Sequence, residues 1–193
     1  LPRRERYPNV TYLLRHGETE WNRPGRLQGH GDSPLTALGL TQARAMGRTL
    51  REVVEDIADY TLVSSPLGRT LQTAHCVAEA IGRDPAEIRQ EPRLREHGFG
   101  AWEGEIYAEI AGRFPAQWRA READKWNYQV PGGESGALLA TRVAAWLGEQ
   151  DEAARLIVVS HGFAGRVLRG LYAGATPAEI FAMSEPQDAF FRL

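Results

Sequence analysis

Four side chains of the types that bind and transfer phosphate stand just after short apolar segments of this chain. Arg15 and His16 follow one such segment, His161 follows another, and Arg69 lies shortly after a third. A guanidinium presents a planar fork of donors that suits phosphate oxygens, and a neutral imidazole can act as a nucleophile. If the fold brings these side chains together, they indicate chemistry on a phosphate group.

Three apolar segments are expected to form the strands that position these residues, at 10–14, 60–63 and 156–159. Each is short and apolar on both faces, which is typical of a parallel sheet covered by helices. Ligands of such sheets bind beyond the carboxyl ends of the strands. We therefore predict an α/β fold with three α/β/α layers, in which a mostly parallel central sheet is flanked by helices and carries the four side chains at one edge.

Helix start signals follow the expected strands. Thr36 and Ser135 are predicted N-caps, and Ser65 is a third because Pro66 stands at the first helical position. The stretch 97–130 has a less regular pattern and is rich in tryptophan. It is predicted to be a lid or an insertion.

Composition excludes several classes of protein. The 193 residues carry 25 acidic and 23 basic side chains, a formal net charge of -2, so nucleic acid is not expected as the main partner. No apolar run has the roughly 18 residues of a membrane span, and residues 1–8 lack the apolar region of a signal peptide. Cys76 is the only cysteine, so no internal disulfide can form. A single cytoplasmic domain over 1–193 is predicted, with its oligomeric state open.

Metal chemistry is not expected from these residues. His16, His30, Cys76, His97 and His161 are candidate ligands, but no His-Glu-x-x-His or paired Cys-x-x-Cys spacing occurs. Glycine-rich dinucleotide and Walker motifs are absent as well. The sequence therefore predicts no metal and no cofactor.

At residues 14–22, with the sequence LRHGETEWN, the chain resembles the signature of the histidine phosphatase superfamily, also called phosphoglycerate mutase-like. The resemblance covers about residues 10 to 172. Further blocks follow in the family order at 28–29, 32–36, 39, 42–43, 64–74, 94–96, 100–104, 131–135 and 158–162.

The resemblance implies that His16 is the nucleophile and forms a phosphohistidine. An imidazole attacks only when it is neutral, and the charges of Arg15, Arg69 and His161 would lower its pKa. These three residues are also the expected donors to the phosphate. The other expected phosphate contacts are Asn22, Gln28, Gly29 and Gly162.

Glu96 matches the acid of the family, which protonates the departing alcohol and then activates water against the phosphohistidine. Glu103 and Glu18 are rival carboxylates. The catalytic set is therefore predicted to be His16, Glu96, His161, Arg15 and Arg69.

The function that this resemblance implies is a metal-independent phosphomonoesterase of the histidine acid phosphatase type, acting on small phosphorylated metabolites. Only 26 residues, 105–130, separate Gly104 from Pro131, whereas the glycolytic mutases of the family have a longer insertion. A short insertion should admit water to the intermediate, which favours the phosphatase branch. The alternatives are a phosphoglycerate mutase and a catalytically silent phosphosite-binding protein. The silent protein is disfavoured because the chain has all three of His16, Glu96 and His161.

Overall fold

A computed structural model describes Tyr7 and residues 9–193. Its central sheet has the strand order β3-β2-β4-β1-β5. The strands are β1 (Val10–Arg15), β2 (Thr61–Ser64), β3 (Arg89–Gln90), β4 (Arg155–Ser160) and β5 (Phe190–Arg192). The three apolar segments are β1, β2 and β4, which confirms the predicted strands; the expectation about a signal peptide concerns residues that lie mostly outside the described part.

The sheet is mostly parallel, as predicted. In the register of β4 with its two neighbours, Val159 stands opposite Leu14 of β1 on one side and Ser64 of β2 on the other. Because these strands are adjacent and parallel, their carboxyl ends meet at one edge. β5 pairs antiparallel with β1, and the sequence pattern did not indicate this strand.

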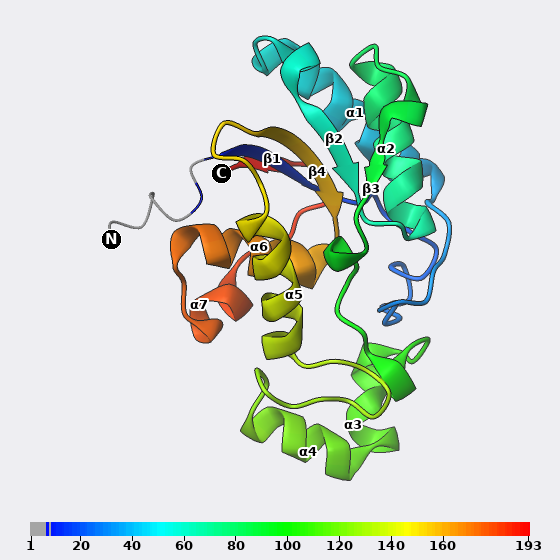
Figure 1. The fold of residues 1–193 in the computed structure, drawn as a ribbon. Helices are drawn as coiled ribbons and strands as arrows, with labels where there is room; N and C mark the ends of the chain where they lie inside the picture. Colours follow the sequence, from blue (N-terminus) through cyan, green and yellow to red (C-terminus); the bar gives the residue numbers. More distant parts are fainter. Residues whose placement is uncertain (1–6, 8) are drawn as a thin grey trace.

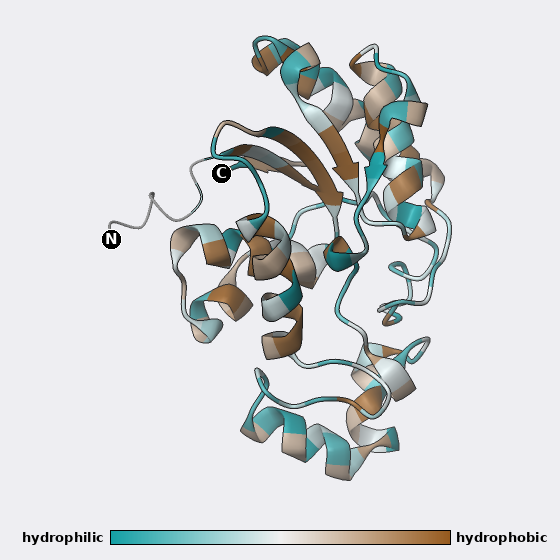
Figure 2. Ribbon diagram, in the orientation of Figure 1, coloured by the Kyte–Doolittle hydropathy of each residue, from teal (hydrophilic) through white to brown (hydrophobic). Residues whose placement is uncertain are grey.

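Two helical layers cover the sheet (Figure 1). α1 (Ala37–Val53) and α2 (Gly68–Ala80) lie on one face, and α5 (Gly136–Gly148), α6 (Gly162–Ala173) and α7 (Pro177–Ala182) lie on the other. Alternate strand residues therefore enter different cores. Leu13 and Val158 pack with α5 and α6, whereas Leu14 and Val159 pack with α1 and α2. Figure 2 shows β2 and β4 coloured mainly as hydrophobic, as expected for strands buried on both faces.

Two of the three predicted helix caps are confirmed. The hydroxyl of Thr36 accepts from the backbone of Gly39 at the start of α1, and that of Ser135 accepts from Leu138 at the start of α5. The third was wrong, because α2 begins at Gly68 with Leu67 as its N-cap. In the first turn of α2, the backbone N–H of Arg69 donates to Asp32 Oδ1 at 3.3 Å. A carboxylate from a loop distant in the sequence therefore accepts a hydrogen bond from the start of this helix.

Residues 97–130, called the insertion below, lie at the bottom of Figure 1 and contain α3 (Ile110–Arg113) and α4 (Pro115–Ala123). A small separate core of Trp102, Ile110 and Val130 holds the insertion together. Backbone hydrogen bonds join it to the loop 25–27, including Leu27 N to Glu105 O at 2.9 Å. No helix of the described residues combines the length and apolarity needed to cross a bilayer.

Candidate active site

A cavity of about 450 Å³ opens beyond the carboxyl ends of β1 and β4. Of the predicted site residues, those that line it are Arg15, His16, Asn22, Gln28, Gly29, Arg69, Glu96 and Gly162. His161 does not line it, but its ring centroid lies 5.3 Å from that of His16. The fold therefore brings all the predicted residues to one place, from three strand ends and the loops beside them.

His16 is buried, and its ring is held by its neighbour. Nδ1 lies 2.8 Å from the carbonyl oxygen of Gly17. A carbonyl can only accept, so Nδ1 carries the proton and the Nε2 of the neutral ring keeps its lone pair. Burial, with the charges of Arg69 and Arg15 adding to it, holds the pKa of His16 well below the usual histidine range. The ring is therefore neutral near neutral pH, with the unprotonated Nε2 as the atom that could act as a nucleophile.

Two arginines present unused donors in the same place. Arg69 Nη1 donates to Gly31 O and Asp32 Oδ1, and its Nη2 donates to Gly29 O. Its Nε is buried with no partner in the described structure. Arg15 donates from Nη1 to Glu185 O, and its Nε is likewise buried and unpartnered. Each guanidinium thus keeps a buried Nε–H for a ligand, and a guanidinium N–H forms a charge-assisted hydrogen bond with an oxyanion.

The loop that holds Arg69 depends on Gly29. Its φ is +55°, and a Cβ there would stand 2.3 Å from Glu103 Oε1. That Glu103 carboxylate accepts from the backbone N–H groups of His30, Gly31 and Phe99. Glu103 therefore organises the carbonyls that orient Arg69, and it does not line the cavity.

His161 is oriented by a residue that the sequence analysis assigned to another task. Its Nε2 lies 2.8 Å from the hydroxyl of Ser65, the predicted helix cap. Burial, with Arg69 and His16 adding to it, holds the pKa of His161 well below its usual value. If the Ser65 hydroxyl donates to the neutral ring, the proton of His161 is on Nδ1, which is buried and unpartnered in the described structure. The Nδ1–H of His161 is therefore the donor that is available to a ligand.

Glu96 is the predicted acid, and its carboxylate is fixed at the start of α6. Oε1 accepts from His97 N at 2.8 Å and Ala164 N at 2.9 Å, and Oε2 accepts from Phe163 N at 3.1 Å. The rival Glu18 accepts from Thr36 Oγ1 and, like Glu103, does not line the cavity. Of the three candidates, Glu96 alone has the position for proton transfer to a bound ester.

The C-terminal segment supplies residues that the sequence analysis did not identify. Gln187 Nε2 donates to Asn22 Oδ1 at 2.9 Å, which leaves the amide N–H₂ of Asn22 for a ligand. Glu185 lines the cavity and pairs with Arg15 and Arg166. Neither residue belongs to a recognisable motif, so only spatial proximity reveals them. Gln28 donates to Thr19 Oγ1, so this side chain supports the wall of the cavity.

The described residues hold no group of three or more His, Cys, Asp or Glu side chains arranged to bind a metal ion. The arrangement present is a buried neutral imidazole, two arginines with unpaired Nε–H groups and the Glu96 carboxylate around a cavity. Such a set can bind a phosphate, attack its phosphorus and move one proton.

Comparisons with known proteins agree with this chemistry. A family model described as "Histidine phosphatase superfamily (branch 1)" matches residues 11–189. A relative from Proteus mirabilis (strain HI4320), named "Probable phosphoglycerate mutase GpmB", is 41% identical over 157 residues, covering 79% of this chain and 69% of its own.

Two solved structures are similar over most of the chain. The alpha-ribazole phosphatase from Shigella flexneri has a TM-score of 0.81 and 26% identity, covering 95% of this chain and 89% of its own. A mycobacterial glucosyl-3-phosphoglycerate phosphatase in complex with VO3 has a TM-score of 0.76 and 30% identity, covering 95% of this chain and 90% of its own.

Proposed function

Because this chain belongs to the histidine phosphatase superfamily, we propose that it is a metal-independent phosphomonoesterase that hydrolyses small phosphorylated metabolites through a phosphohistidine on His16. The proposal includes the histidine acid phosphatase type of mechanism and a cytoplasmic location. The observation that carries it is the state of His16. Its Nδ1 is committed to Gly17 O, and its Nε2 is free in the cavity that Arg15 and Arg69, each with an unpaired Nε–H, also line.

The first half-reaction forms the phosphohistidine. Nε2 of His16 attacks phosphorus, and the bond from phosphorus to the ester oxygen breaks as the alcohol leaves. Protonated Glu96 gives its proton to that departing oxygen. Arg15, Arg69 and the Nδ1–H of His161 hold the charge on the phosphoryl oxygens, and charge-assisted bonds of this kind are roughly twice as strong as neutral ones.

The second half-reaction returns the enzyme to its starting state. The Glu96 carboxylate takes a proton from a water molecule, whose oxygen attacks the phosphohistidine. The bond from Nε2 to phosphorus then breaks, inorganic phosphate leaves, and Glu96 is protonated again for the next ester. One water is consumed for each ester, and no redox or metal step is needed.

The decisive experiment is rapid quench with ³²P-labelled substrate. Label should be trapped on His16, labile to acid and stable to alkali, and His16→Ala should trap none. Prolonged EDTA treatment should leave the rate unchanged, while vanadate should inhibit as a transition-state analogue. Label on a serine or aspartate, or activity that EDTA removes and a divalent ion restores, would contradict the proposal.

A phosphoglycerate mutase is the second candidate, because the Proteus relative bears that name. The 26 residues 105–130 and the similarity to two phosphatase structures favour hydrolysis. Incubation with 3-phosphoglycerate distinguishes the two. A phosphatase releases inorganic phosphate or leaves the substrate intact, whereas a mutase forms 2-phosphoglycerate in a reaction that depends on a bisphosphate primer.

A further inference from the structure

We infer that the outer part of the cavity is a second anion site, which selects phosphate esters whose alcohol has an apolar or aromatic body ending in a carboxylate or a second phosphate. This inference rests on the proposed function and concerns the alcohol, not the transferred phosphate. The outer site is formed by Arg26, Arg121 and Lys125.

The cavity is larger than a phosphate needs. At about 450 Å³ it lies within the range of roughly 300 to 1,000 Å³ of sites that enclose whole small molecules. Away from His16, its walls are mainly aromatic, with Phe99, Tyr107, Tyr128, Phe163 and Phe181. These rings offer an apolar path between the catalytic end and the outer cations, so the body of the alcohol should be apolar or contain a ring.

The charges of the outer site do not cancel. Arg121 and Lys125 both pair with Glu122, at 2.8 Å and 2.9 Å. Arg26 has no acidic partner among the described residues, and its Nη1 donates to Gly104 O. Three cations thus face one carboxylate, which leaves an excess of positive charge at the mouth of the cavity. An oxyanion of the substrate would offset that excess.

Two of these cations are held in place before any ligand binds. Arg26 Nη1 donates to Gly104 O, and its backbone forms an isolated β-bridge with Ile106. The neighbouring backbone hydrogen bond from Tyr107 N to Gly25 O ties the same loop to the insertion. The Arg121 guanidinium lies 5.5 Å from the ring of Trp118 and its side chain is only 17% exposed. Positions fixed in this way reduce the ordering cost of binding an anion.

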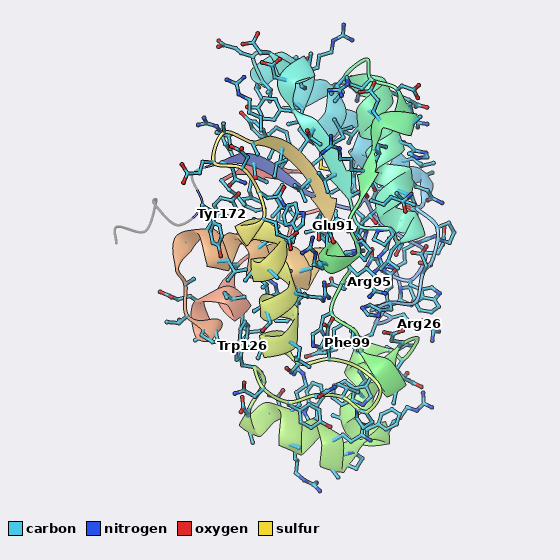
Figure 3. All side chains as sticks on the ribbon, in the orientation of Figure 1. Arg26, Glu91, Arg95, Phe99, Trp126 and Tyr172 are labelled. Atoms are coloured by element: carbon cyan, nitrogen blue, oxygen red, sulfur yellow. The ribbon has the colours of Figure 1, made fainter. Side chains whose placement is uncertain are left out.

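The outer site is built from different elements than the catalytic end. Arg121 lies on α4 and Lys125 just after it, whereas Arg15 and His16 lie at the end of β1. Figure 3 shows Arg26 and Phe99 between the sheet above and helices α3 and α4 below. A substrate that reaches from His16 to the outer site has the transferred phosphate at one end of its alcohol body and the second anion at the other end.

A matched pair of aryl phosphates tests the inference. The two esters carry an ethyl or a 2-carboxyethyl chain at the para position of phenyl phosphate, so that the leaving phenols are similar and only the distal charge differs. We expect kcat/KM to be roughly tenfold higher for the carboxylate ester. A third ester with a 2-phosphonoethyl chain separates the two kinds of anion: a larger gain than with the carboxylate indicates a second phosphate, and an equal or smaller gain indicates a carboxylate.

Three variants locate the effect, namely Arg26→Gln, Arg121→Gln and Lys125→Gln. Each should lower the ratio of kcat/KM values between the charged and uncharged esters, and the triple variant should bring it to about one. Arg119→Gln is the matched control, since Arg119 is an exposed arginine of α4 that does not line the cavity. For Arg119→Gln, the ratio of kcat/KM values between the charged and uncharged esters should equal that of the wild-type protein.

Binding measurements keep this test independent of turnover. The non-hydrolysable phosphonates that correspond to the first two esters can be titrated by calorimetry, with the charged one expected to bind roughly tenfold more tightly. Equal affinities and equal kcat/KM values would overturn the second anion site while leaving the phosphatase intact. Tight binding of the charged phosphonate without hydrolysis of any ester would support the site and contradict the proposed function. A preference that survives the triple variant would also overturn the inference.

Discussion

At the scale of single residues, the site depends on hydrogen bonds that leave particular atoms unused. Gly17 O fixes His16 with Nε2 free, and Ser65 holds His161 with Nδ1 free. Arg15 and Arg69 each keep a buried Nε unpaired. Buried polar atoms without partners are rare in folded proteins, and the three on Arg15, Arg69 and His161 beside one cavity indicate a site organised for an anion.

The role of Glu96 can be tested with two leaving groups. A sugar alkoxide needs a proton as its bond breaks, whereas p-nitrophenolate does not. Glu96→Gln should therefore slow phosphorylation of His16 by roughly 10²- to 10⁴-fold for an alkyl phosphate and much less for p-nitrophenyl phosphate. Single-turnover rates of phosphorylation provide the measurement, because loss of the base slows the second step for both substrates.

A structural effect of this substitution must be separated from the chemical one. The Gln amide can no longer accept from all three backbone N–H groups that Glu96 now serves, which should cost about 1 to 3 kcal/mol of stability. Thermal unfolding measures that cost. Equal losses of rate for the two substrates would show that Glu96 is not the acid.

Ser65 is predicted to act through His161. Ser65→Ala removes the hydroxyl that lies 2.8 Å from Nε2, so the ring loses the partner that sets its tautomer. We expect kcat to fall about 10- to 100-fold, the usual effect of losing a partner that orients a functional histidine. Ser65→Thr keeps a hydroxyl and should restore most of the rate. Failure of Thr to restore it would assign the loss to packing.

At the scale of elements, three adjacent parallel strands bring distant residues to one edge, and the insertion closes the other side of the cavity. The insertion has its own core and is tied to the loop 25–27 by backbone hydrogen bonds. Its position, and with it the outer wall of the cavity, therefore depends on that small core more than on the two cores of the sheet.

Trp102→Ala tests this separation. Trp102 is fully buried, and its Nε1 donates to Gln117 Oε1, so its removal should cost about 3 to 5 kcal/mol within the insertion. Amide hydrogen exchange should accelerate in residues 97–130, with little change in β1 and β4, and kcat/KM should fall. Leu138→Ala, at an exposed position of α5, is the control and should change neither the amide exchange of residues 97–130 nor kcat/KM. Uniform loss of protection across the sheet would contradict the separation.

At the scale of the whole molecule, charge is strongly segregated. The chain has a formal net charge of -2, yet the cavity is lined by six cationic side chains and two carboxylates. The cations are Arg15, Arg26, Arg69, Arg121, Lys125 and Arg166. Such a concentration of one sign raises the local concentration of anionic substrates, an effect that added salt should weaken.

Stability should depend on pH through the buried histidines. Burial, followed by Arg69 and Arg15, lowers the pKa of His16 in the folded state below the unfolded value of about 6.5. As the pH falls below about 6.5, the unfolded chain therefore takes up a proton that the folded chain does not, and the free energy of unfolding decreases.

For each buried histidine with a lowered pKa, such as His16 and His161, the free energy of unfolding should fall by about 1.4 kcal/mol per pH unit below about 6.5, until the folded-state pKa is reached. His16→Asn removes this contribution, and the Asn amide can still donate to Gly17 O. Denaturant unfolding between pH 7.5 and 5.5 should show a shallower slope for His16→Asn than for the wild type. His75→Asn, at an exposed position of α2, is the control and should keep the original slope. Identical slopes for all three would contradict the shift.

The sequence by itself determined the elements whose signals are local. Apolar runs marked β1, β2 and β4, two hydroxyl caps marked the starts of α1 and α5, and the residues around His16 indicated phosphate chemistry. Local spacing suffices for these features because strand burial and helix capping involve residues within a few positions of one another.

Only the tertiary structure decided the partners of the site residues. Asp32 serves the start of α2, Ser65 orients His161, and Gln187 orients Asn22. It also placed Glu96, which the sequence already favoured over Glu18 and Glu103, at the cavity, and it paired β5 with β1. These contacts join residues that are mostly tens of positions apart or more, and a hydrogen bond depends on the distance between atoms in space, which the spacing of residues along the chain does not specify.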